Sequence, residues 1–72
     1  MTGRILKSGA HIARMAVVAQ ADGTFEAQVY VRLVREPEVA ETYIPSGIFG
    51  TEEEAWAGAR ERATRALAEH EF

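Results

Sequence analysis

The sequence contains no cysteine, and it has only two histidines and two prolines among its 72 residues. The absence of cysteine excludes disulfide bonds and thiolate zinc sites. The two histidines, His11 and His70, are too far apart in sequence to form a recognisable ligand spacing. A domain of this length buries only about 60% of the surface that its unfolded chain exposes. A partner subunit is therefore the remaining common way to enlarge the core.

Long hydrophobic runs are also missing. No run approaches the ~18 apolar residues that a transmembrane helix needs, so we expect no membrane association. Arg4, Lys7 and the segment Ala19-Gln20-Ala21 have some features of a secretory signal, but His11 and Arg14 interrupt the stretch that would have to be apolar. The lack of cysteine fits a reducing compartment, and we expect a cytoplasmic protein.

The composition, 47% hydrophobic and 26% charged, is typical of a globular domain. A net charge of −3 argues against bulk attraction to nucleic acid. The charge is uneven, because residues 1–21 carry Arg4, Lys7 and Arg14 and no acid. We interpret residues 1–72 as a single domain in which residues 1–9 are a basic leader.

Two strands are predicted from alternating apolar residues. In residues 25–34 the alternate positions from Phe25 to Leu33 are apolar, a period of two. Residues 11–20 contain several β-branched residues and no helix cap. Asp22-Gly23 between them indicates a hairpin.

The register of this hairpin follows from burial. A two-residue loop would place Arg14 on the core face, whereas a three-residue loop, 22–24, places Ala13, Met15 and Val17 there. We therefore predict the longer loop, with Gly23 in the left-handed conformation. This register puts Arg14 directly opposite Arg32.

A third strand is predicted at about residues 39–45. Glu36-Pro37 marks the preceding turn, and a four-residue loop, 35–38, would pair Val34 with Val39. Pro45 cannot donate a backbone hydrogen bond, so we expect it to end the strand at a sheet edge.

The same register predicts the contacts of this third strand. On the outer side of the sheet Arg32 faces Glu41 and Tyr30 faces Tyr43. On the inner side, toward the core, Val29 faces Ile44.

The C-terminal segment, about residues 52–69, is predicted to be a helix. Thr51 and Glu54 form a capping box, T-x-x-E, and residues 52–54 place three glutamates where the helix dipole favours anions. One sector of the helix is apolar, consisting of Trp56, Leu67 and the alanines 55, 59, 63 and 66. The fold class is thus α+β: a three-stranded antiparallel β-meander packed on one C-terminal α-helix (β-β-β-α).

No residue pattern points to catalysis. Neither His11 nor His70 has a Ser, Asp or Cys at a recognisable catalytic spacing. The glutamates at 52–54 fit a helix N-terminus, and they would repel a phosphate there. We therefore predict no catalytic residue, no metal ligand and no cofactor site, and expect that the protein is not an enzyme.

The sheet face opposite the helix is the candidate interaction face. One helix covers only one side of a sheet, so the other side would expose a patch of apolar and charged residues. The candidate residues are Ile12, Arg14, Val18, Tyr30, Arg32, Val34, Glu41 and Tyr43.

Two partners are considered for this face. The first is protein, most simply a second copy in a homodimer, through the face or an edge strand. The second is single-stranded nucleic acid, with Tyr30 and Tyr43 stacking on bases and Arg14 and Arg32 binding phosphates. Protein association is favoured, because the patch is apolar and the net charge is negative.

The segment from Tyr43-Ile44-Pro45 through Phe49 to Trp56 resembles a pattern found in small bacterial β-β-β-α proteins of unknown function. The Thr-x-Glu-Glu-Ala helix opening, read here at Thr51 to Ala55, is similar to that of HicB-type antitoxins over about 30 residues. The chain lacks that family's Pro-Gly-Cys turn and its DNA-binding C-terminal segment. The resemblance implies an antitoxin-like regulator as an alternative, and no functional residue carries over.

Overall fold

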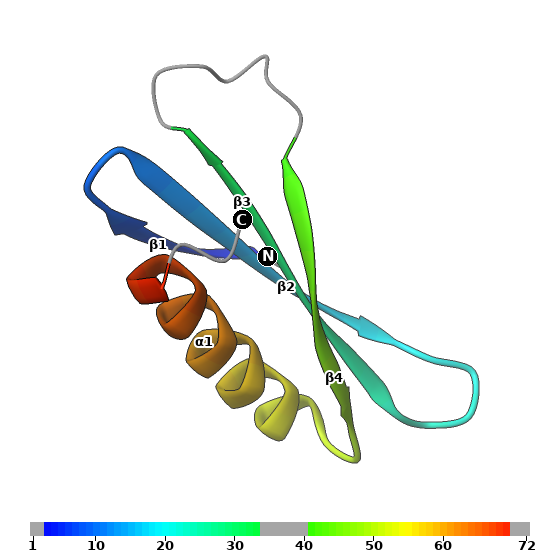
Figure 1. The fold of residues 1–72 in the computed structure, drawn as a ribbon. Coiled ribbons are helices and arrows are strands. Elements are labelled where there is room, and N and C mark those ends of the chain that lie inside the picture. Colours follow the sequence, from blue (N-terminus) through cyan, green and yellow to red (C-terminus); the bar gives the residue numbers. More distant parts are fainter. Residues whose placement is uncertain (1–2, 34–40, 70–72) are drawn as a thin grey trace.

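The fold is a four-stranded antiparallel sheet with one helix packed on one face (Figure 1). The computed structural model describes residues 3–33 and 41–69. Sheet order follows chain order, and the elements are β1 (Gly3–Ser8), β2 (His11–Ala19), β3 (Phe25–Leu33), β4 (Thr42–Phe49) and α1 (Glu52–Glu69). The predicted α+β meander followed by a helix is confirmed, but the sheet has four strands rather than three.

The first strand corrects the prediction of a basic leader at residues 1–9. β1 pairs with β2 from Gly3↔Ala16 to Ser8↔His11 without a break in register. Gly9 and Ala10 form the connecting turn, and Gly9 has a φ of 59°. A two-residue hairpin loop needs a positive φ at its first position, which glycine adopts without strain. β1 therefore extends the sheet sideways.

The β2–β3 hairpin has a three-residue loop as predicted, but the loop lies one residue earlier, at 21–23. The Gln20 amide donates to the Thr24 carbonyl at 2.8 Å, and the Gly23 amide donates to the Gln20 carbonyl at 3.1 Å. Gly23, with a φ of 89°, is the last loop residue, where this class of hairpin places its left-handed residue. The pairing shifts by two residues, so Arg14 lies opposite Tyr30 and not opposite Arg32.

The fourth strand corrects the predicted strand at 39–45. β4 runs through Pro45 to Phe49, because β4 is an edge strand and its unpaired side does not need the missing amide of proline. The pairs Tyr30↔Tyr43 and Val29↔Ile44 are as predicted, and the register shifts between Glu26 and Gln28. The predicted loop 35–38 and the pair of Val34 with Val39 lie outside the described residues.

The helix spans the predicted residues. The Glu54 amide donates to the Thr51 hydroxyl at 3.1 Å, which is the first half of the predicted capping box. The face of α1 toward the sheet consists of alanines 55, 59, 63 and 66, all with no exposed surface, and Leu67. They pack on the inner sheet residues Ala13, Met15, Ala27, Val29, Val31 and Ile44, with Leu6, Val17, Phe25, Phe49 and Trp56 partly buried around them.

Candidate interaction face

The sheet side turned away from α1, called the outer face below, carries the exposed large hydrophobic side chains. Pairing places Ile5 beside Arg14, Tyr43 beside Tyr30, and both Val18 and Ile48 beside Glu26. The exposed fractions of Ile5, Val18, Tyr43 and Ile48 are 60%, 43%, 42% and 61%, and among the described residues these are all the exposed large hydrophobics. Every one of them therefore lies on the face that the helix leaves open.

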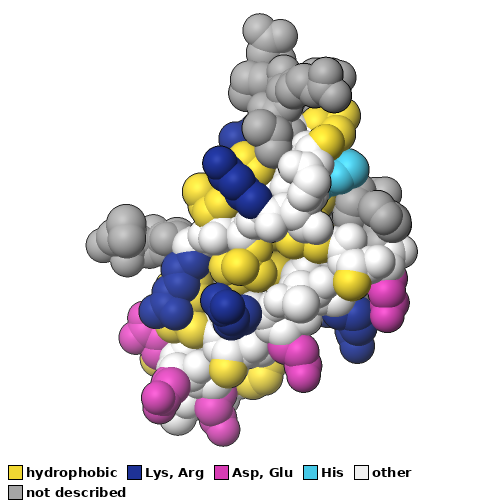
Figure 2. Space-filling view, turned by 90° about the vertical axis from the view of Figure 1, so that its left-hand side faces the viewer, with side chains coloured by type: hydrophobic (Ala, Val, Ile, Leu, Met, Phe, Trp, Pro, Cys, Tyr) yellow, Lys and Arg dark blue, Asp and Glu magenta, His cyan; other side chains and the backbone are white. Residues whose placement is uncertain are grey.

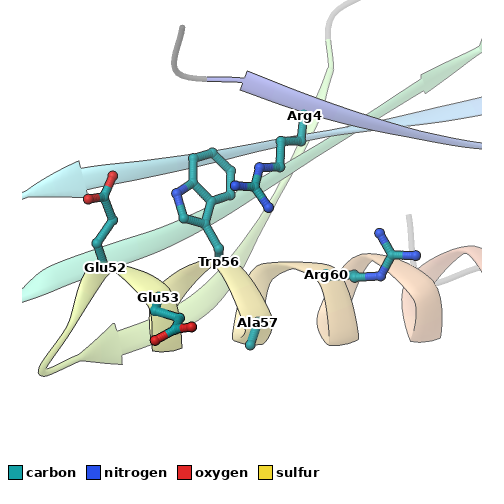
Figure 3. Close-up of a pocket in the computed structure, with 6 residues that line it drawn as sticks. All are labelled: Arg4, Glu52, Glu53, Trp56, Ala57 and Arg60. Carbon is teal, nitrogen blue, oxygen red and sulfur yellow. The ribbon is translucent and has the colours of Figure 1, made fainter.

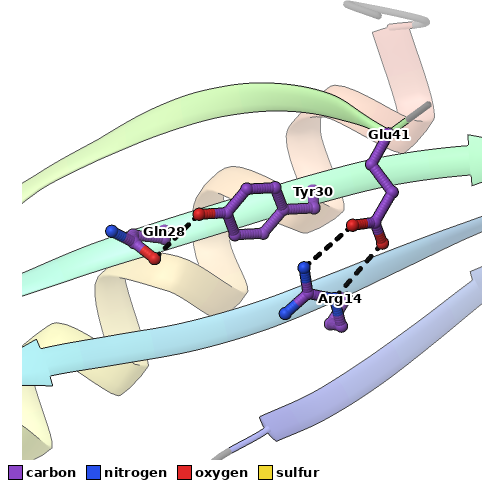
Figure 4. Close-up of polar contacts among 4 residues, drawn as sticks. All are labelled: Arg14, Gln28, Tyr30 and Glu41. Atoms are coloured by element: carbon purple, nitrogen blue, oxygen red, sulfur yellow. Dashed lines mark hydrogen bonds and ion pairs between the residues drawn. The ribbon is translucent and has the colours of Figure 1, made fainter.

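Arg14 binds Glu41 across the neighbouring strand. The Arg14 Nε and Nη2 atoms donate to the two Glu41 carboxylate oxygens at 3.2 and 2.8 Å, the bidentate geometry that suits this pair (Figure 4). The Arg14 guanidinium also lies 4.4 Å from the centre of the Tyr30 ring. The pair thus links β2 to the start of β4 over β3. Arg32 was predicted to face Glu41, and its charge does help to lower the pKa of that carboxyl. The bidentate bond from Arg14 is an additional contact, which the predicted register of β2 with β3 did not include.

A second set of side-chain hydrogen bonds runs along β3. The Tyr30 hydroxyl donates to the Gln28 side-chain oxygen at 2.9 Å, and the Gln28 amide donates to Glu26 at 3.3 Å. The Tyr43 hydroxyl donates to the other Glu26 oxygen at 3.3 Å, and the rings of Tyr30 and Tyr43 are 5.2 Å apart. The middle of the outer face is therefore a satisfied polar network with apolar side chains around it.

These contacts move three pKa values on this face. The hydrogen bond from Arg14 holds the pKa of Glu41 below its usual value, and the same bond raises the pKa of Arg14. Desolvation, followed by the charge of Glu26, raises the pKa of Tyr43. The carboxylate at Glu41 and the neutral hydroxyl at Tyr43 are thus the favoured forms at neutral pH.

We expect the free energy of unfolding to fall as the pH drops below 4.5, the ordinary pKa of Glu41, and to fall less in a Glu41→Gln variant. The folded state lowers this pKa, so the stabilisation is complete above the unfolded value and is lost as the pH falls through the folded one. Both side chains are partly exposed, so the pair contributes about 0.5–1 kcal/mol. Urea denaturation at several pH values measures the difference.

Glu61→Gln is the matched control, because Glu61 is exposed on the helix and its removal leaves the Arg14 pair intact. Asp22 contributes in the same direction in every variant, since the Thr24 hydroxyl lowers its pKa. Identical pH profiles for the unmodified protein and Glu41→Gln would show that the ion pair does not stabilise the fold.

The structure brings most of the predicted face together. Arg14, Val18, Tyr30, Arg32, Glu41 and Tyr43 all lie on or beside the outer face. Ile12 is on this face but is only 8% exposed, since it lies between the long side chains of Lys7 and Arg32. It is therefore not available for contact, which corrects its place among the candidates. Val34 lies outside the described residues.

Two residues of the face were missed from sequence. Ile5 was assigned to the leader, and Ile48 follows the proline that was expected to end the last strand. The signal for Ile5 was present, because Ser8-Gly9-Ala10-His11 is a glycine-first hairpin turn between two alternating segments. For Ile48 the signal was weaker, since only the position of β4 at the sheet edge lets the strand continue past Pro45.

The described residues offer little else that could form a reactive site. Among residues 3–33 and 41–69 no group of three or more His, Asp or Glu side chains lies close enough to hold a metal ion. His11 lies half-buried at the start of β2, and His70 is outside the described residues. Within these same ranges, no helix is long and apolar enough to cross a membrane.

Comparison with protein-family models gave no match, and comparisons with curated proteins and with solved structures gave none at the significance required.

Proposed function

We propose that this protein is a non-enzymatic interaction module that pairs with a second copy of itself through the outer face. The observation that carries the proposal is the position of Ile5, Val18, Tyr43 and Ile48, which are exposed and all lie on that face. Exposed hydrophobic side chains that gather on one face of a small protein mark an interaction surface, and here they surround a polar network. A domain with a small core also gains most from burying this surface against a partner.

The charges of the outer face favour a second copy as the partner. Lys7 and Arg32 lie in one row at one end of the face, on either side of Ile12. Glu26 lies toward the other end, between Val18 and Ile48. Two sheets packed face to face about a two-fold axis that runs across the strands would bring the cationic end of one copy near the anionic end of the other.

Single-stranded nucleic acid receives less support from this geometry. Arg14, which was assigned to a phosphate, is bound to Glu41 and lies over the Tyr30 ring that was assigned to a base. Glu26 adds a negative charge beside Tyr43. A nucleic acid would have to displace these contacts before it could stack.

We expect Ile48→Lys to convert a dimer into a monomer. A lysine at this position would replace an exposed hydrophobic side chain of the interface with a charge that has to be desolvated, and such changes commonly cost about 2 kcal/mol or more, about 30-fold in affinity. Tyr30 is a poorer probe, because its ring and hydroxyl belong to the polar network. Sedimentation velocity across a micromolar concentration series measures the effect.

Ala57→Lys is the matched control, since Ala57 is exposed on α1 and receives the same charge. It should leave the dimer unchanged. An unmodified protein that is monomeric at all concentrations tested would refute self-association, and a dimer that survives Ile48→Lys would exclude the outer face.

A further inference from the structure

The two edges of the sheet differ in how well they could accept another strand. β4 contains Pro45, a shift in register and Gly47 with a φ of 103°, so its free edge is irregular. β1 has no proline and pairs with β2 in unbroken register over its whole length. Among the strands that the structure describes, β1 pairs with β2 alone. Its other side therefore presents a regular row of backbone donors and acceptors.

Two hollows, together called the groove, lie between β1 and α1 on the helix side of the sheet. At one end it has a volume of about 620 Å³ and is lined by Arg4, Trp56 and the helix residues Glu52, Glu53, Ala57 and Arg60 (Figure 3). The Arg4 guanidinium lies 4.3 Å from the centre of the Trp56 ring. At the other end a smaller hollow of about 290 Å³ is lined by Leu6, Lys7, Ser8, Thr64, Leu67 and Ala68. The hollow beside Leu6 and Leu67 is thus mainly apolar, whereas the larger one is lined by charged side chains together with Trp56.

The charged side chains along this edge determine which ligand charge would be favoured. Within residues 3–33 and 41–69, Lys7 and Arg60 form no ion pair, and Arg4 contacts only the Trp56 ring. Figure 2 views this side of the molecule, where hydrophobic side chains lie between Lys and Arg side chains and acidic side chains lie lower down. The acids that line the groove, Glu52 and Glu53, lie at the N-terminal end of α1, away from Lys7. Of the described residues that line the hollow at the other end, Lys7 is the one charged residue and none is acidic.

We propose that the free edge of β1 binds an extended acidic segment of another protein by strand addition. Backbone hydrogen bonds to β1 would hold the segment, and alternate side chains would point to opposite sides of the extended sheet. Apolar side chains on the inner side would enter the hollow beside Leu6 and Leu67. Acidic side chains on the outer side would lie next to Lys7. The ligand is thus a short amphipathic strand with acidic and apolar residues in alternation.

A second copy of this chain fits the edge less well. Pairing β1 with another β1 would bring two copies of Arg4 and Lys7 together, and lysine on an edge strand is a device that opposes such pairing. The same charges attract an acidic strand. This site shares Lys7 with the cationic end of the outer face, but Ile48 lies at the opposite edge of the sheet, so Ile48→Lys tests the proposed self-association without touching this site.

The test is a fluorescence anisotropy titration at low salt with a labelled peptide of four Glu-Val repeats. We expect saturable binding in this titration. In an NMR titration with the same peptide, the backbone amide resonances of β1 should shift. A peptide of the same composition with all its glutamates before its valines should bind about tenfold more weakly, because it cannot place one residue type on each side. Lys7→Glu should also weaken binding of the alternating peptide about tenfold.

Arg65→Glu is the charge-matched control, because Arg65 is exposed on α1 and away from β1. It should leave the affinity unchanged, and so should Ile48→Lys on the outer face. The proposal is overturned if the two peptides bind equally, if Lys7→Glu and Arg65→Glu weaken binding equally, if no binding is detected at low salt, or if the shifted amides lie outside β1.

Discussion

Replacing Gly58 with alanine should destabilise this protein, although the same change stabilises most helices. Gly58 lies in α1 against the side chain of Phe49, the last residue of β4. A Cβ atom at position 58 would lie 2.3 Å from Cζ and 2.8 Å from Cε1 of the Phe49 ring. Contacts this short require the ring or the helix to move. Glycine at this position therefore serves close packing between α1 and the end of β4.

The expected loss can be bounded from two opposing effects. Alanine gains about 1 kcal/mol over glycine in a helix interior. Overpacking typically costs about 1–3 kcal/mol, and this clash involves three ring atoms of one partly buried side chain. The difference is a net loss of at most about 2 kcal/mol, and because the contacts with the ring are so short we expect a value toward that upper end, measured by urea denaturation.

Phe49→Ala provides the background that isolates this clash. With the ring removed, Gly58→Ala should become neutral or stabilising, because only the helix preference remains. A double-mutant cycle should thus give a coupling of about 1–3 kcal/mol between the two positions. A stabilising effect of Gly58→Ala in the unmodified protein would contradict the close contact between the Phe49 ring and the helix.

Enlarging the alanine face of α1 should have a still larger effect. Alanines 55, 59, 63 and 66 are fully buried, and their small size lets the helix lie close to the sheet. Ala59→Leu would add three carbon atoms in the middle of this contact. We expect a loss of about 3 kcal/mol, at the upper end for overpacking, and a core of this size supplies only about 3–5 kcal/mol in total. Ala59→Leu should therefore leave much of the protein unfolded.

Ala57→Leu is the matched control on the same helix. Ala57 is exposed, and a leucine there should change the free energy of unfolding by no more than about 0.5 kcal/mol. Circular dichroism during thermal unfolding compares the two variants. Equal stability of Ala59→Leu and Ala57→Leu would show that the helix does not pack closely on the sheet through its alanines.

In the hairpin between β2 and β3, the alternation of apolar residues predicted the face of each side chain but not its cross-strand neighbour. Arg14 was placed on the outer face, and it lies there. Its partner was expected to be Arg32, and it is Tyr30. Moving the loop by one residue shifts every pair by two, which preserves the face of each side chain and changes its neighbour. The same shift gave Arg14 a bond to Glu41 that no sequence pattern indicated.

The extent of the sheet was underestimated at both edges. Residues 1–9 were assigned by their charge, which hid the alternation of Arg4 and Leu6 with Ile5 and Lys7. The strand predicted to end at Pro45 continues to Phe49. Edge strands are hard to recognise, because only their place in the sheet decides whether a proline or a row of charged residues is tolerated.

The sequence by itself determined the helix, its cap and its alanine face, and also which residues of β2 and β3 point toward that helix. These features depend on local spacing, on a period of 3.6 or 2 residues and on capping chemistry between near neighbours. The tertiary structure decided the fourth strand, the pairing of Arg14 with Glu41 and the contact of Phe49 with Gly58. Each of these joins residues from different elements, so it depends on register and on the distance between layers, which local spacing does not fix.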